Sequence, residues 1–193
     1  MHQINMINTH TFLAKLIHWT FIPLYAYGIF KQVDDLNQLE DPSFLNFEIL
    51  FAIVFLIIVL LRYFYMKDTP ALLGANDDMH KAHLYIAKTV HRLVYFSLIM
   101  LPTTGLLIAG LFNLGIGRID IAIAIHEFSA FLSYTVIGLH VGASIYSRFK
   151  GEGLWNSMVP IWKEKGKKNS DLISKLEDIE NKVYEKIEDI FIN

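Results

Sequence analysis

The stretch from Ile49 to Leu61 reads ILFAIVFLIIVLL and contains no polar side chain. Apolar neighbours extend it to about residues 44–66, which as a helix is long enough to cross a hydrocarbon core about 30 Å thick. The whole chain of 193 residues is 53% hydrophobic, an unusually high share for a soluble domain of this size. The sequence therefore predicts an integral membrane protein.

Three further apolar runs have the length of a membrane span, at about residues 12–30, 86–112 and 119–146. Together the four runs predict an all-α membrane protein, a bundle of four transmembrane helices within residues 1–162. Residues 163–193 form a charged tail whose apolar residues recur every three or four positions, which predicts an amphipathic helix. This pattern suits equally a helix lying on the membrane surface and one that binds a partner.

The connecting segments predict the orientation of the chain. The segment between the first two spans is mostly acidic, whereas the second connection and the end of the fourth span are basic. Lys and Arg near span ends favour the cytoplasmic side of the inner membrane. We therefore expect a multi-pass protein of the inner (cytoplasmic) membrane with both termini in the cytoplasm.

Charge and cysteine content exclude several classes of function. The formal net charge is only -2, so no general positive field attracts nucleic acid. The chain has no cysteine, which excludes disulfides, thiolate zinc sites, iron–sulfur clusters and covalently attached c-type haem. Any bound metal must therefore depend on histidine.

The fourth span carries His126 and His140. Fourteen residues at about 100° each leave a net rotation near 40°, so both rings project from one face of the helix, about 21 Å apart along its axis. One helix thus offers a potential metal ligand to each leaflet of the membrane.

Two other histidines match the predicted depth of His140, namely His18 in the first span and His91 in the third. A haem iron with two imidazole ligands needs only two of these three, which leaves one to bond a haem propionate or a quinone carbonyl. A single intramembrane histidine is often just a buried, hydrogen-bonded side chain, but four on three spans favour b-type haem. Propionates need cations, and Lys15, Arg62, Arg92 and Arg148 lie near the same end, where span-flanking cations are also expected.

His126 has no such partner. The second span begins with Phe44-Leu-Asn-Phe-Glu48, and no histidine occurs between His18 and His80. The remaining histidines, His2, His10, His80 and His83, lie in polar flanks and are predicted to be solvated.

Three stretches resemble the bacterial cytochrome b561 family, which is related to the b-type cytochrome subunits of membrane-bound nickel–iron hydrogenases. They are Leu16-Ile-His-Trp19; His91-Arg-Leu-Val-Tyr95 with Leu101-Pro-Thr-Thr-Gly105; and His126-Glu-Phe128 with Leu139-His-Val-Gly-Ala143 and Met158-Val-Pro160. The likeness covers about Lys15 to Pro160.

The resemblance implies a bundle with two b haems. One is held by the first and fourth helices, which here means His18 and His140. The other takes His126 and a histidine early in the second helix, which this chain lacks, so one haem is expected and a second is left open. Such cytochromes typically exchange electrons with membrane quinones, while their donors vary.

The favoured hypothesis is thus a membrane b-type cytochrome that transfers electrons between a redox donor, free or as a partner subunit, and the quinone pool through bis-histidine haem. A second hypothesis is a divalent-metal carrier that uses the same histidines, but intramembrane carboxylates are scarce apart from Glu127. A third is a non-redox membrane anchor that recruits a partner through its tail.

Overall fold

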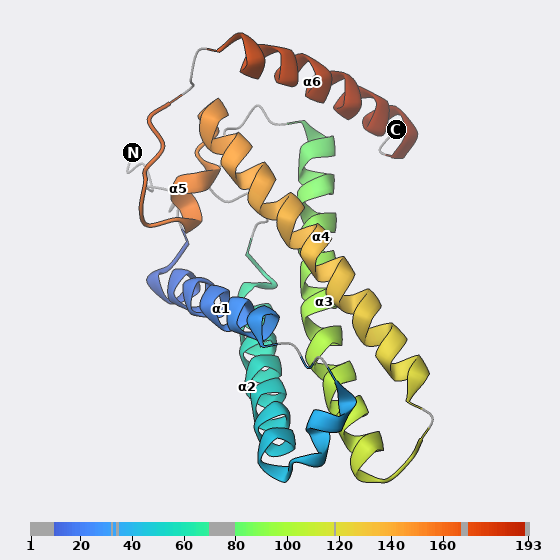
Figure 1. Ribbon diagram of the computed structural model, residues 1–193. Helices are drawn as coiled ribbons and strands as arrows, with labels where there is room; N and C mark the ends of the chain where they lie inside the picture. Colours follow the sequence, from blue (N-terminus) through green and yellow to red (C-terminus); the bar gives the residue numbers. More distant parts are fainter. Residues whose placement is uncertain are drawn as a thin grey trace. The chain divides into compact units, whose positions relative to one another are not determined.

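The computed structural model describes residues 10–31, 33, 35–69, 80–117, 119–166 and 170–191. These residues form helices and connecting turns, and none of them lies in a β-strand (Figure 1). In chain order the elements are α1 (Phe12–Phe30), the short 3-10 helix η1 (Leu36–Glu40), α2 (Pro42–Met66), α3 (Lys81–Asn113), α4 (Asp120–Lys150), α5 (Leu154–Met158) and α6 (Asp171–Phe191). The predicted all-α class is confirmed.

Each predicted span falls on one long helix, and local chemistry explains where the bounds differ. α2 begins at Pro42 because the Asp41 carboxylate accepts a hydrogen bond from the Ser43 backbone N–H at 2.9 Å, and proline suits the first helical position. α3 begins at Lys81 rather than near residue 86, since its first turn is polar and gives no apolar signal. The predicted amphipathic helix of the tail is α6.

Among the described residues, α2, α3 and α4 are long and apolar enough to cross a membrane. Leu50, Ile57 and Leu61 of α2 are 51% to 61% exposed, which suits contact with lipid better than contact with water. α1 has 19 residues and also carries Lys15, His18 and Pro23, and it is not among the three. Its predicted membrane crossing stays a prediction.

The chain folds into two compact units. The first consists of the described parts of Met1–Lys15, Thr69–Arg92 and Gly138–Asn193, and the second of the described parts of Leu16–Asp68 and Leu93–Ile137. α3 and α4 pass from one unit into the other, so each unit contains one end of both helices. The predicted division at residue 162 followed the change in composition and stays a prediction.

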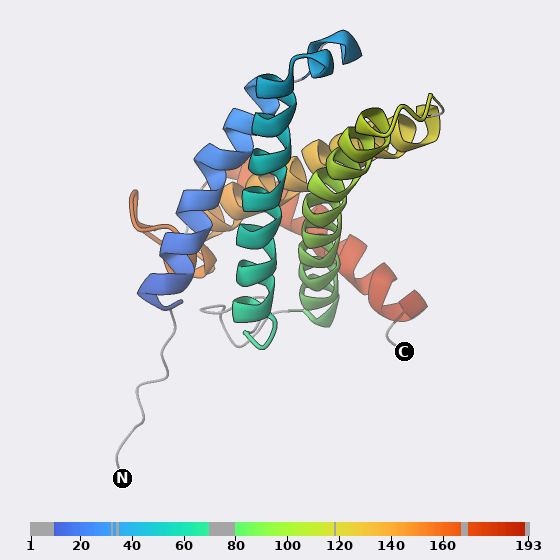
Figure 2. The ribbon, with the colours of Figure 1, turned by 90° about the horizontal axis from the view of Figure 1, so that it is seen from below.

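An apolar core joins α1, α2 and α3 in the second unit. The rings of Phe21 and Phe55 pack with centroids 5.0 Å apart, and Val59 and Leu98 are buried beside them. Figure 2 shows α1 and α2 side by side. The hydroxyls of Tyr25 and Ser133 lie 2.7 Å apart and link α1 to α4.

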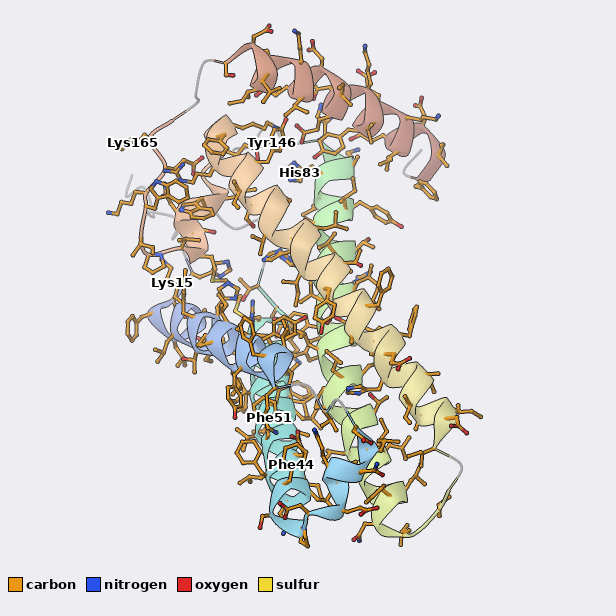
Figure 3. The ribbon with its side chains drawn as sticks, in the orientation of Figure 1. Lys15, Phe44, Phe51, His83, Tyr146 and Lys165 are labelled. Carbon is orange, nitrogen blue, oxygen red and sulfur yellow. The ribbon has the colours of Figure 1, made fainter. Side chains whose placement is uncertain are left out.

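One ion pair stands out at the α1–α2 turn of this unit. Lys31 pairs with Glu48, and its Nζ lies 4.2 Å from the ring centroid of Phe47 and 4.9 Å from that of Phe44. Figure 3 labels Phe44 on α2. Burial lowers the pKa of Lys31. Glu48, one of the residues expected at the depth of His126, is thus engaged by a cation.

Candidate functional site

In the first unit, α3 and α4 bring His91 and His140 together. Their ring centroids are 5.1 Å apart with the planes tilted by 59°, and both side chains are half-buried. The sequence had placed both histidines at one depth, and the structure confirms that they are neighbours. An iron bound by two imidazoles lies about 2 Å from one nitrogen of each ring, along the lone pair in the ring plane, which places the two ring centroids about 6 Å apart. At 5.1 Å, the rings of His91 and His140 are closer together than this spacing.

His18 lies on α1 in the second unit, where its ring meets Trp19 edge-on at 6.4 Å. Because His18 and His140 belong to different units, their pairing stays a prediction.

His126 is held by a threonine of the facing helix within the second unit. Its Nδ1 lies 2.8 Å from Thr104 Oγ1, and that hydroxyl also lies 2.7 Å from the backbone carbonyl of Met100. The hydroxyl has a single proton and donates it to the carbonyl, so it accepts the proton of Nδ1. The ring also forms a hydrogen bond with the backbone carbonyl of Leu101, so groups of α3 orient this imidazole from two positions. The ring rests against Gly105, where an added Cβ would lie 3.6 Å from His126 Cε1.

Nothing in the sequence signalled this hydrogen bond, because Thr104 and His126 are on different helices. The histidine partner that the family pattern expects on the second helix is absent from the sequence, and Glu48 is paired with Lys31. His126 is therefore oriented by Thr104, but no second imidazole ligand for it occurs on α2.

The cations predicted to serve propionates lie in different surroundings. Arg62, near the end of α2, stacks over Tyr95 with its guanidinium carbon 5.8 Å from the ring centroid. Its Nε is buried and has no hydrogen-bond partner among the described residues. A buried cationic donor of this kind costs free energy unless an acceptor reaches it, and a carboxylate fits that need. The buried Nε of Arg62, together with histidine rings that could bind iron, fits a haem with propionate groups.

The other three cations differ. Lys15 is half-buried in the first turn of α1, and Arg92 on α3 is exposed. Arg148 donates to the backbone carbonyls of Trp162 and Lys163 at 3.1 and 3.4 Å and stacks on the Trp162 ring at 3.8 Å. Arg148 thus fixes the segment after α5, a role that its position in the sequence did not suggest.

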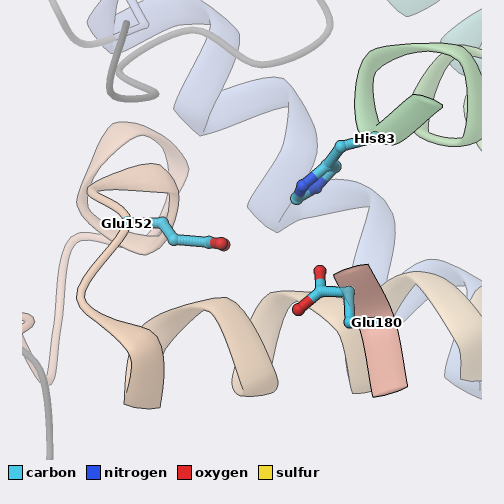
Figure 4. Close-up of side chains that lie close together, drawn as sticks. All are labelled: His83, Glu152 and Glu180. Carbon is cyan, nitrogen blue, oxygen red and sulfur yellow. The ribbon is translucent and has the colours of Figure 1, made fainter. Parts of the chain in front are cut away.

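A polar cluster that the sequence did not predict joins three elements of the first unit. Figure 4 shows His83 of α3, Glu152 of the turn after α4 and Glu180 of α6 pointing toward one another. One ligand atom from each lies within 4.8 Å of the others, the spacing of a metal site. Lys150 Nζ, however, lies 2.5 Å from Glu152 Oε1 and 2.7 Å from Glu180 Oε2. A cation thus already stands between the two carboxylates, and we interpret the cluster as an ion network that docks α6.

Two tyrosines complete this ion network. Tyr146 and Tyr184 donate to the Glu180 carboxylate at 3.0 and 2.5 Å, and His83 lies against the Tyr184 ring with centroids 5.4 Å apart. Burial raises the pKa of Glu180, but the hydrogen bonds from Lys150 and the two tyrosines outweigh it and lower that pKa overall. His83 is half-buried, so its predicted solvation is wrong; the tail helix that covers it could not be placed from composition.

Sequence comparison gives one match. The family described as prokaryotic cytochrome b561 matches residues 9–160, which include His18, His91, His126 and His140 and end before α6. No curated protein and no solved structure matches the chain.

Proposed function

Since the chain belongs to the prokaryotic cytochrome b561 family, a family of membrane b-type cytochromes in electron transfer, we propose that it passes electrons between a redox donor and the membrane quinone pool through haem b held by two histidines. The observation that carries the proposal is that the family match contains all four histidines that the sequence predicts to lie in the membrane. Haem supplies the one-electron chemistry, while the protein sets its potential through ligands, burial and hydrogen bonds.

We assign the axial positions to His18 and His140. Support comes from their equal predicted depth in the membrane and from the His91–His140 contact, in which the two rings are closer together than two ligands of one iron would be. His91 then stands beside the axial ring, where its charge and hydrogen bonding adjust the potential or hold a quinone carbonyl.

Arg62 is the cation best suited to a propionate, since its buried Nε lacks an acceptor among the described residues. Lys15 and Arg92 are the further candidates. A propionate carboxylate that accepts the hydrogen bond of Arg62 would also take the place of water at this position.

The spectrum of the purified protein tests the proposal directly. We expect the reduced-minus-oxidised difference spectrum of a low-spin b haem, and a pyridine haemochrome assay giving one tightly held haem per chain. Protein that inserts and folds but shows no haem absorption would refute the function.

We also propose that the protein lies in the inner membrane with both termini in the cytoplasm, on the strength of the basic segments that flank the same ends of the spans. A reporter fused after Asn193 should be active as a cytoplasmic fusion, and one inserted at Asn37 as an external one. Reversed activities would contradict this orientation.

A further inference from the structure

α6 has a row of apolar side chains that the rest of the first unit leaves exposed. This row, the α6 stripe, consists of Leu172, Leu176, Ile179, Val183 and Ile190, which are 41% to 67% exposed. Their spacing of three or four residues, interrupted only near the end, places them along one side of the helix. α6 docks through a different side, with Glu180 bonded to Lys150 and Glu188 to the backbone N–H of Ala82 at 3.0 Å. The helix therefore turns polar groups toward its own protein and apolar groups outward.

Charge is distributed unevenly around the α6 stripe. At about 100° per residue, the three lysines of the helix, Lys175, Lys182 and Lys186, line the border of the stripe that lies away from the docking side. All three are exposed. The exposed acids Asp178 and Glu185 lie on the opposite half of the helix, whereas Asp171 and Asp189 lie close to the lysine border and Asp171 pairs with Lys175 at 2.7 Å. An apolar stripe edged by lysines is the pattern of a helix that lies in a membrane interface.

The contacts of α6 place it at the level of the lipid headgroups. Phe191 stacks on Tyr85 at 6.4 Å, and Glu180 meets Tyr146 and Lys150, all at the margins of the predicted spans or just beyond them. α3 has 33 residues, and at 1.5 Å per residue it extends about 50 Å, well beyond a hydrocarbon core of about 30 Å. The ends of α3 and α4 to which α6 is docked therefore project out of the core.

The segment that leads into α6 has the same character. Ile161 and Trp162 are 64% and 62% exposed, and Lys163 and Lys165 beside them are exposed as well. Tryptophan and lysine are typical of the membrane interface, where the ring sits among headgroups and the ammonium meets phosphate.

We propose that the α6 stripe rests on the surface of a bilayer containing anionic phospholipids, with its lysine border on their phosphate groups. Lys182 and Lys186, with Lys163 and Lys165 in the segment before α6, favour this occupant over an uncharged surface. The stripe also belongs to the end of the protein that is predicted to lie at the bilayer surface. All these residues follow position 160, where the family match ends, so the inference is independent of the electron-transfer function.

The absence of cysteine allows a sharp test, because one introduced cysteine can carry an environment-sensitive fluorophore. Full-length protein with Val183→Cys is labelled and reconstituted, one copy per nanodisc, in phosphatidylcholine with or without phosphatidylglycerol. The matched control is Glu185→Cys on the opposite half of α6. With phosphatidylglycerol, the label at 183 should emit at shorter wavelength and resist quenching by acrylamide, while the label at 185 should stay in water.

Removing the lysine border should weaken this association. Lys182→Gln and Lys186→Gln should each lower the ratio of membrane-bound to detached α6 by roughly fivefold, whereas Glu185→Gln should not. A label at 183 that is quenched as readily as the one at 185 overturns the proposal. A spectral shift of the same size in phosphatidylcholine alone also overturns the proposal. So does a shift that appears only with two copies per nanodisc, because it assigns the α6 stripe to a second chain.

Discussion

His126 and His140 lie on one helix, project from similar faces, and have different neighbours. The His140 ring contacts the imidazole of His91, whereas His126 bonds the hydroxyl of Thr104 and no histidine occurs on α2. One end of α4 is thus rich in imidazoles. The other has a single imidazole, which is held by the hydroxyl of Thr104. The difference favours the His140 end as the place for the proposed bis-histidine site.

The largest expected effect is the difference in low-spin haem signal between the His140 and His126 variants. His140→Ala should abolish the low-spin haem signal, because it removes one of two axial ligands, and His18→Ala should do the same. His126→Ala should leave that signal largely intact. Paramagnetic resonance with a pyridine haemochrome assay measures both. Two equivalent low-spin haems in the unmutated protein would show that His126 has a second ligand, and a signal that survives His18→Ala would transfer the axial role to His91.

Thr104→Val sharpens the comparison at the His126 end. It leaves the Nδ1–H of a half-buried imidazole without its acceptor, which should cost about 1–3 kcal/mol of unfolding free energy. Thr103→Val is the matched control, since the Thr103 hydroxyl is exposed and bonds only the Ile99 carbonyl. Thermal denaturation in detergent compares them, with the low-spin signal unchanged in both. Equal stabilities would mean that the Thr104–His126 bond contributes nothing.

His91→Phe tests the neighbour of His140. An apolar ring should keep the haem and its low-spin signal, but shift the midpoint potential, because a polar ring next to the ligand is lost. A redox titration followed at the reduced absorption band gives the shift, and Thr89→Val, at an exposed and uncharged position on the other side of α3, serves as the control. Loss of the haem would instead make His91 a ligand.

The smallest effect concerns the ion network that docks α6 beside the His140 end. The pKa of Glu180 is lowered in the folded protein, so its contribution to docking is complete above the ordinary value of 4.5 and disappears as the pH falls through the lowered value. Hydrogen exchange of residues 180–184 should therefore stay slow from neutral pH to about 4.5 and accelerate only below it, after correction for the intrinsic rate. In Lys150→Gln the acceleration should begin at higher pH. An unchanged profile would remove Lys150 from the network.

Much of the fold could be read from local sequence. Apolar length predicted the four long helices, and the spacing in the tail predicted α6, because helix periodicity and membrane thickness are local constraints. The same arithmetic predicted equal depth for His91 and His140, and the structure brings their rings together. The family likeness, confirmed over residues 9–160, rests on motifs within single helices.

Tertiary structure decided what depends on contacts between distant segments. The Thr104–His126 bond needs the rotation of α4 about its axis relative to α3, which apolar periodicity does not specify. The network of Lys150, Glu152 and Glu180 needs α6 to fold back on the ends of α3 and α4, and composition alone suggested a separate tail. The sequence by itself determined which residues lie in the long helices and predicted their depth in the membrane. Packing decided which side each helix turns to its neighbours, because many rotations bury similar apolar area and only specific hydrogen bonds and ion pairs select one.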